Sequence, residues 1–175
     1  MPRLIGYHWV KSCYGQWFPG DERGHWSEAW DEQIGYIEPH ILHPGDPMRR
    51  RMAEERTKHP PAVLDNTMIR VVADTIANCS TASDWNVAAI AIEPTHVHLA
   101  MTQTARDVNK TVKWLAYQTA KSIHRLTSHT GPVWCKGRWL EFIDDASHWE
   151  NLNRYINEHN ERRYGTPHPF HFVIQ

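Results

Sequence analysis

Two histidines stand two positions apart in an apolar stretch of the chain, EPTHVHLAM at residues 93–101. Successive side chains of a β-strand point to opposite faces, so His96 and His98 would share one face at a Cα separation of about 7 Å while Val97 faces the other way. Imidazole is a common metal ligand. The spacing therefore allows both rings to bind one ion, although two histidines on the wetter face of an ordinary strand would show the same pattern.

A second pair of chemically capable residues lies in the sequence NLNRYINEHNERRY, residues 151–164. On a helix, Tyr155 and His159 are four residues apart and lie on one face. A phenol beside an imidazole ligand could act as a covalent nucleophile next to a metal ion. The same two residues could simply line an amphipathic helix whose apolar edge is Leu152 and Ile156. The spacing alone leaves both interpretations open.

Hydrophobic periodicity predicts the elements that would carry these residues. A strand-like run at residues 4–12 is followed, after a long excursion, by a helix that Asp65 or Asn66 caps. Two further strand-like runs are joined by Glu93-Pro94-Thr95, which predicts a hairpin. The order of elements predicts an α+β fold, an antiparallel sheet with helices packed on one face. The remaining predicted elements are strands at 85–92, 96–102 and 131–144, and helices at about 105–127 and 147–163.

The segment at about 15–60 is rich in glycine and proline. We expect one domain over residues 1–175 with this segment as an irregular insertion, since long irregular excursions in compact domains are usually functional or surface insertions. Asp46 and Pro47 predict one helix inside it, at 46–57, because aspartate caps helices and proline fits their first turn.

Charge is distributed unevenly along the chain. The formal net charge is −1, but residues 106–138 hold seven cations and one carboxylate, a local charge of +6 that leaves −7 for the rest. A basic segment on an acidic body predicts a phosphate-binding surface, although a solvated helix face would look the same. The candidate DNA-binding residues are Lys110, Lys113, Lys121, Arg125, Lys136 and Arg138.

Composition excludes several classes of protein. There is no run of about 18 apolar residues, which argues against a membrane span, and the start of the chain lacks the pattern of a secretory signal. We therefore expect a cytoplasmic protein with no membrane partner. The three cysteines, Cys13, Cys79 and Cys135, are far apart and odd in number, which argues against a disulfide framework and excludes a CxxC zinc site.

Taken in order, PTHVHLAM, the basic segment, VWCKGRW and RYINEHN resemble the single-tyrosine HUH transposases of small bacterial insertion sequences, including the repeat-associated tyrosine transposases. The resemblance covers most of the chain from residue 66 onward, and YGQWFPGDERG near the start is similar to a subgroup of these proteins. It implies a ferredoxin-like HUH nuclease fold. It also implies that His96 and His98 form the HUH pair and that Tyr155, in a Tyr-Ile context, is the nucleophile.

The same resemblance implies a divalent metal, Mg²⁺ or Mn²⁺. In this family a polar residue four positions after the tyrosine, often glutamine or asparagine, completes the metal site. Here that position is His159, a departure that shifts the expected preference from Mg²⁺ toward Mn²⁺ or another transition metal, because imidazole is a borderline ligand.

The activity that the resemblance implies is cleavage and rejoining of single-stranded DNA through a 5′-phosphotyrosine intermediate. The expected partner is single-stranded DNA with a hairpin, and the resemblance allows a homodimer. Two other functions stay open at this point. One is a domesticated or cleavage-inactive protein that binds DNA hairpins, and the other is a metal-dependent phosphodiesterase that uses HxH and water.

Overall fold

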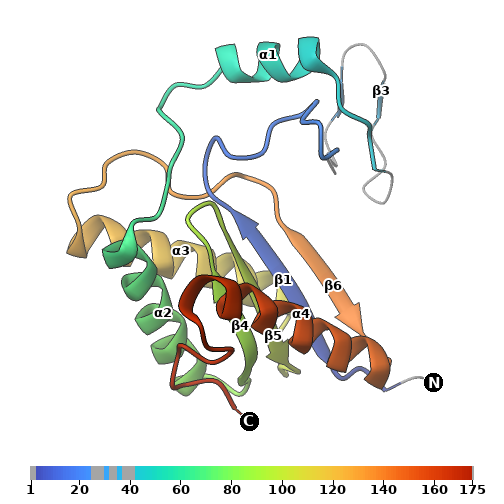
Figure 1. The fold of residues 1–175 in the computed structure, drawn as a ribbon, viewed down its shortest axis with the longest axis vertical. Coiled ribbons are helices and arrows are strands. Elements are labelled where there is room, and N and C mark those ends of the chain that lie inside the picture. Colours follow the sequence, from blue (N-terminus) through green and yellow to red (C-terminus); the bar gives the residue numbers. More distant parts are fainter. Residues whose placement is uncertain (1–2, 25–29, 32–34, 37–41, 175) are drawn as a thin grey trace.

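A four-stranded antiparallel sheet in the order β4-β5-β1-β6 forms the centre of the molecule (Figure 1). The computed structural model describes residues 3–24, 30–31, 35–36 and 42–174. Each strand of the sheet falls inside a stretch predicted to be a strand, so the α+β class and the antiparallel sheet are confirmed. The strands are β1 (Gly6–Ser12), β4 (Val87–Ile92), β5 (His96–Thr102) and β6 (Trp139–Ile143).

Each of the four helices that the described residues form begins directly after an aspartate whose carboxylate accepts one or two backbone N–H groups of the first turn. These caps satisfy donors that have no partner inside the helix, which is why the helices start where they do. The last helix ends at Gly165, which adopts a left-handed conformation with φ of 70°. The helices are α1 (Pro47–Glu55), α2 (Asn66–Thr81), α3 (Val108–Leu126) and α4 (Ala146–Tyr164).

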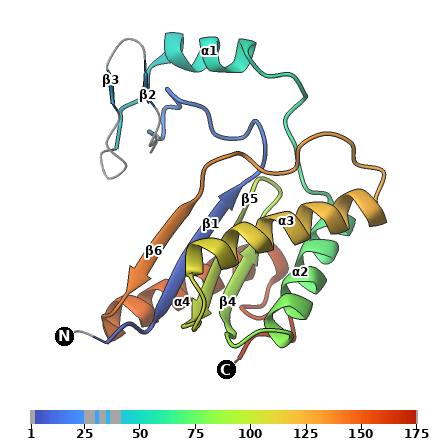
Figure 2. The same ribbon diagram turned by 180° about the vertical axis from the view of Figure 1, so that it is seen from behind.

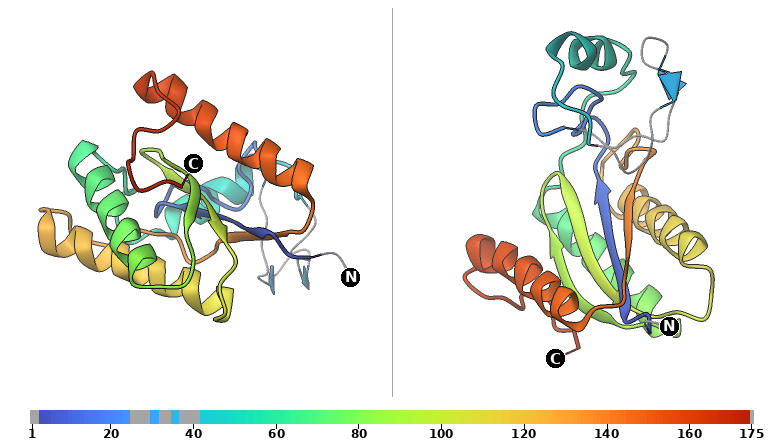
Figure 3. Two further views of the ribbon diagram at one scale, coloured as in Figure 1. Left: turned by 90° about the horizontal axis from the view of Figure 1, so that it is seen from below. Right: turned by 90° about the vertical axis from the view of Figure 1, so that its right-hand side faces the viewer.

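The helices cover both faces of the sheet, which corrects the expectation that they pack on one face (Figure 3). On one side α2 and α3 bury large apolar side chains against Val97, Leu99 and Met101 of β5. On the other side α4 packs against the alternate residues of the same strands. Hydrophobic periodicity marks which side of a helix is apolar, but it does not say which face of the sheet that side covers.

The two faces differ in the size of their side chains. Alanines form most of the sheet surface beneath α4, at Ala89, Ala91 and Ala100, where they meet Leu152 and Ile156 of the helix. Small side chains let a helix approach the sheet closely. Asn160, buried one turn further along, donates hydrogen bonds of 2.9 Å to the carbonyl oxygens of Ile90 and Pro167 and so ties α4 to β4. The position of α4 over β5 is therefore fixed by packing along its inner edge.

Above the end of the sheet, where β1 ends and β5 begins, lies the segment between β1 and α2 (Figure 2). It contains α1 and a two-stranded ladder of β2 (Trp30–Asp31) and β3 (Gly35–Tyr36). Asp46 caps α1 and Pro47 opens it, as predicted. Within the insertion expected at about 15–60, residues 25–29, 32–34 and 37–41 lie outside the described residues. In the part of the chain that the structure describes, no helix is long and apolar enough to cross a membrane.

Candidate active site

His96 and His98 lie on β5, an interior strand, and their side chains occupy the face that α4 covers. The register places Val10 of β1 and Ala91 of β4 on either side of His98. Val97 between the two histidines is fully buried on the opposite face. The alternation of the strand therefore separates two imidazoles from the main apolar core and presents both to one helix.

Tyr155 and His159 come from α4 and lie next to this pair. The Tyr155 ring centre is 5.5 Å from that of His98 and 4.8 Å from that of His159, edge-on in both cases. Tyr155 keeps 45% of its surface exposed, so the residue is open to solvent beside the histidines. Both residues flank the buried Leu152–Ile156–Asn160 edge of the helix, which explains why one anchored helix places them together.

The three histidine rings are close, but they do not form a finished metal site. Ring centres are 4.8 Å apart for His96 and His98, 5.1 Å for His98 and His159, and 6.3 Å for His96 and His159. A nitrogen about 2.1 Å from an ion puts its ring centre roughly 3.2 Å away, so two ligand rings at ordinary angles are about 4.5–5.3 Å apart. The first two separations fit this range and the third is wider. Accordingly, among the described residues no three His, Cys, Asp or Glu side chains are already grouped to hold a metal ion.

The hydrogen bonds of the three rings nevertheless follow one pattern. In each ring it is Nδ1 that meets a neighbouring polar group, which leaves Nε2 as the nitrogen available to a ligand. Nε2 of His159 is buried and has no hydrogen-bond partner within the described part of the chain. An orphaned, buried imidazole nitrogen beside two other histidines fits a cation ligand. The Nδ1 contacts are Thr95 Oγ1 at 3.0 Å for His96, His8 Nε2 at 3.1 Å for His98 and Glu93 Oε1 at 3.4 Å for His159.

Burial keeps the strand histidines neutral, the form in which imidazole binds metals. It lowers the pKa of His98 to about 2, with further contributions from the neighbouring rings of His96, His8 and His159. Burial also lowers the pKa of His96, against an opposing effect of Glu93. The pKa of His8 falls to about 4, again chiefly because the ring is buried. At neutral pH these three rings are therefore uncharged, each with a single N–H.

His8 and Glu93 belong to this site, although the sequence analysis did not select them. His8 lies on β1 and is 90 residues from His98 in the chain, so only the β1–β5 register brings them together. Glu93 had a local signal, since it opens the same EPTHVHLAM stretch. It contacts His159 and, at 3.6 Å, Nη1 of Arg163, one turn further along α4.

The basic residues expected to bind DNA are not brought to this cluster. Lys110, Lys113, Lys121 and Arg125 lie exposed on α3, which packs on the opposite face of the sheet (Figure 3). Lys136 and Arg138 lie in the loop before β6, where Arg138 donates a hydrogen bond to Asn109 of α3. The predicted site residues therefore form two separate groups, one beneath α4 and one on and beside α3.

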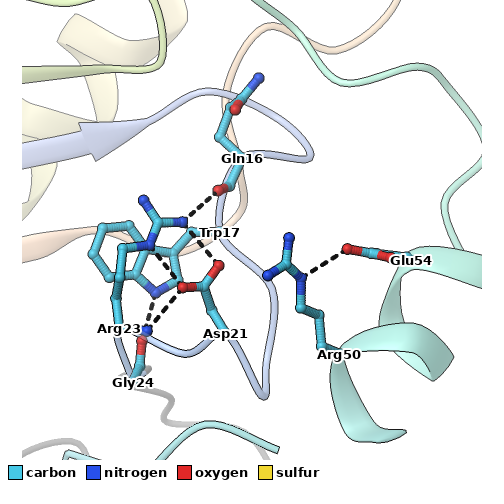
Figure 4. Close-up of polar contacts among 7 residues, drawn as sticks. All are labelled: Gln16, Trp17, Asp21, Arg23, Gly24, Arg50 and Glu54. Carbon is cyan, nitrogen blue, oxygen red and sulfur yellow. Dashed lines mark hydrogen bonds and ion pairs between the residues drawn. The ribbon is translucent and has the colours of Figure 1, made fainter. Parts of the chain in front are cut away.

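Polar contacts hold together the loop that follows β1 (Figure 4). Arg23 donates hydrogen bonds to both carboxylate oxygens of Asp21, from Nε at 2.7 Å and from Nη2 at 2.8 Å. Its guanidinium carbon lies 4.2 Å from the centre of the Trp17 ring. This pairing holds the pKa of the buried Asp21 carboxyl down at about 2. The charge of Arg23 also reaches His96, where it makes the smallest contribution to the lowered pKa. The chain leaves β1 beside the candidate site, because Ser12 pairs with His96 and the N–H of Cys13 donates a hydrogen bond to the carbonyl oxygen of Thr95.

Solved structures with a similar fold are transposases by name. One is the structure of a REP-associated tyrosine transposase bound to a REP hairpin, with a TM-score of 0.54 and 10% sequence identity, covering 93% of this chain and 70% of that one. Another is a candidate transposase from Deinococcus radiodurans R1, with a TM-score of 0.47, 13% identity, and coverage of 90% and 92%. At 10% identity, the similarity to the first structure shows a shared fold and nothing about activity.

The sequence itself defines the family. The family described as "Transposase IS200 like" matches residues 55–159, a span that includes β5 and runs along α4 as far as His159. The chain belongs to the IS200-like transposase family. Comparison with curated proteins gives no match.

Proposed function

We propose that this transposase is a metal-dependent single-stranded DNA transesterase that cleaves and rejoins DNA through a 5′-phosphotyrosine intermediate. The observation that carries the proposal is the position of Tyr155, an accessible phenol whose ring lies within 5.5 Å of both His98 and His159. Two imidazoles and a phenol converge there from elements far apart in the chain. Nucleophilic catalysis next to a metal requires such a group.

In the proposed reaction the Tyr155 oxygen attacks the scissile phosphorus. The new bond joins the tyrosine oxygen to phosphorus, and the bond from phosphorus to the 3′ oxygen breaks. The phenol releases its proton and the departing 3′ oxygen takes one up. One phosphodiester replaces another, so attack by a 3′-hydroxyl on the phosphotyrosine can rejoin a strand without ATP.

The chain's own residues provide the ligands and their orientation. We assign Nε2 of His96, His98 and His159 as the atoms that would hold Mg²⁺ or Mn²⁺, because Nδ1 of each ring meets another group. When bound, such an ion would polarise the scissile phosphate as a Lewis acid. Thr95, His8 and Glu93 would hold the rings in place, as groups behind metal ligands commonly do.

We assign DNA-backbone binding to the surface of α3. Its exposed face carries Lys110, Lys113, Lys121 and Arg125, with Trp114 and Tyr117 exposed between them. Cations interleaved with aromatic rings suit a strand whose phosphates and bases both need partners. Arg106, Lys110 and Trp114 also line a hollow of about 460 Å³ at the start of the helix. Since the similar structure holds a REP hairpin, we propose that a DNA hairpin binds here and that its single-stranded flank reaches Tyr155.

Incubation with Mn²⁺ and labelled single-stranded oligonucleotides, with and without a hairpin, tests the proposal. The expected product is an adduct between protein and DNA that survives SDS, with a free 3′-hydroxyl on the released strand. Cleavage without an adduct would instead indicate a phosphodiesterase that uses water. Hairpin binding without cleavage would indicate a binding protein that has lost the activity.

A further inference from the structure

Behind the metal-ligand candidates lies a line of polar side chains that crosses three elements. His8 of β1 contacts His98 of β5 through Nε2 and Nδ1 at 3.1 Å, with the ring centres 5.4 Å apart and the ring planes at 20° to each other, so the two rings meet edge to edge. Glu141 of β6 stands directly opposite His8 in the β1–β6 register, with Oε2 at 3.8 Å from His8 Nδ1. His148, in the first turn of α4, lies 3.7 Å from the other carboxylate oxygen.

The contact between the two rings has one donor and one acceptor. A neutral imidazole carries one N–H and one lone pair. Once it is known which ring donates the hydrogen bond between His8 Nε2 and His98 Nδ1, the tautomers of both rings are therefore fixed. The carboxylate of Glu141 can only accept a proton, and it faces Nδ1 of His8. A proton on that nitrogen leaves Nε2 of His8 as an acceptor, and His98 must then donate from Nδ1.

We propose that His8 is a positioning residue that holds His98 in the tautomer with its proton on Nδ1, and that Glu141 sets the direction of this contact. His98 Nε2 is then left as a lone pair that points away from His8, available to the ion of the proposed site. This inference rests on the proposed function for its use of the ion, but the tautomer itself is a property of the protein alone. An imidazole ligand whose other nitrogen is held in this way binds metal more tightly, and losing the holding group typically costs about 10–100-fold in affinity.

His8 is well placed for this role because its position is fixed from several sides. It is 8% exposed and lies on β1 between the two neighbouring strands that carry its partners. His98, also 8% exposed, is its hydrogen-bond partner, so neither ring can easily turn to solvent. His148 is more exposed, with 45% of its side chain accessible, and forms the outer end of the line.

The test is a long-range ¹H–¹⁵N spectrum of the full chain, freed of metal with EDTA, in which the shifts of the two ring nitrogens report the tautomer of each histidine. We expect Nδ1–H for both His98 and His8. In His8→Phe the acceptor is gone, and His98 should gain the Nε2–H form. His8→Gln, whose amide oxygen can accept the same proton, should restore Nδ1–H. Unchanged nitrogen shifts of His98 in His8→Phe would overturn the proposal.

Metal affinity gives a second measurement. If His8 had only a structural role, the affinity would not fall in His8→Phe and recover in His8→Gln. Titration of Mn²⁺ by calorimetry should show binding weakened about 10–100-fold in His8→Phe and largely recovered in His8→Gln. Should His8→Phe fail to fold, Glu141→Leu is the alternative variant, since Glu141 lies on the edge strand β6 and leucine offers no acceptor to His8. There His8 should lose its fixed Nδ1–H form, and unchanged His8 shifts would contradict the role of Glu141. A correct tautomer without any DNA adduct would refute the proposed function and leave this inference standing.

Discussion

Tyr155 and His159 lie one turn apart on α4 with their ring centres 4.8 Å apart, and both face the histidines of β5. This relationship depends on α4 being held over β5, where the sheet surface beneath the helix carries small side chains. The inner edge of α4 packs on alanines, and Asn160 bonds to the backbone of β4. The proposed nucleophile and the ligand candidates can therefore be perturbed separately, by substitutions in the helix, in the strand or in the packing between them.

Replacing the strand histidines tests the metal assignment. His96→Ala and His98→Ala should each weaken Mn²⁺ binding at least about tenfold, because each removes one candidate ligand. His159→Gln should keep most of the binding and the DNA adduct, since a glutamine oxygen can replace the Nε2 ligand, whereas His159→Ala should not. Calorimetry measures the affinity and denaturing gels measure the adduct. Full Mn²⁺ affinity in His96→Ala and His98→Ala together would rule out this site.

The basic surface of α3 should control binding but not chemistry. Changing Lys110, Lys113 and Lys121 together to glutamine should flatten the salt dependence of DNA affinity by about 2–3 units of slope, because each lost phosphate contact removes roughly 0.7–0.9. Since α3 lies on the face opposite Tyr155, the rate of adduct formation at saturating DNA should stay unchanged. The matched control is Arg49→Gln, Arg50→Gln and Arg51→Gln in α1. A salt slope that falls in the control and not in the α3 variant would place the DNA surface on α1.

The approach of α4 to the sheet depends on Gly6. A Cβ atom there would lie 2.5 Å from the carbonyl oxygen of Met101 and 2.7 Å from the Trp149 ring of α4, so either the strand or the helix must move. Gly6→Ala should lower the free energy of unfolding by about 1–3 kcal/mol and reduce adduct formation by displacing α4. Gly137→Ala is the control, because a Cβ there meets nothing within 4 Å. Equal stability of the two variants in urea titrations would contradict this role.

Acid should destabilise the metal-free protein through His8 and His98. Their pKa values fall from 6.5 to about 4 and about 2 on folding, so between these values and 6.5 the unfolded chain binds protons that the folded chain does not. Stability is then present above pH 6.5 and is lost as the pH falls. At pH 5 the loss amounts to at most about 2 kcal/mol for each ring relative to pH 7.5. Urea titrations in EDTA should show this decline, with a smaller decline in His8→Phe. A wild-type stability that does not change between these pH values would refute it.

Much of the fold could be predicted from the sequence because its signals are local. Period-two and period-3.6 patterns mark β4, β5, α2 and α3, and an aspartate precedes every helix. The placement of α4 on the second face could not be predicted, since the apolar edge of Leu152 and Ile156 does not by itself indicate which face of the sheet it covers. Contacts between strands that are far apart in the sequence could not be predicted either. No short, periodic spacing in the sequence links His8 to His98, because only the register of β1 against β5 brings them together.

The residues of the candidate site likewise differ in whether local sequence signals indicate them. Spacings within one strand and one helix made His96, His98, Tyr155 and His159 candidates, and the family resemblance gave them their expected roles. The structure brings their rings together. The basic residues were selected by composition alone, which carries no information about the face on which α3 packs. Glu93 and His8 join the candidate site through contacts with its side chains, which no spacing in the sequence indicates.

The most direct test of the central claim is the DNA adduct formed by Tyr155→Phe. The substitution removes only a hydroxyl from a ring that is 45% exposed, so folding, Mn²⁺ binding and DNA binding should be retained. The measurement is the yield of SDS-stable adduct with Mn²⁺ and a labelled oligonucleotide, followed by peptide mass mapping of the modified residue in the wild-type protein. Tyr117→Phe, which removes a hydroxyl from an exposed tyrosine of α3, is the matched control. We predict that adduct formation stops in Tyr155→Phe and continues in Tyr117→Phe, with the wild-type adduct mapping to Tyr155. An adduct that persists in Tyr155→Phe, or that maps to Tyr117 or Tyr164, would contradict the assignment of the nucleophile.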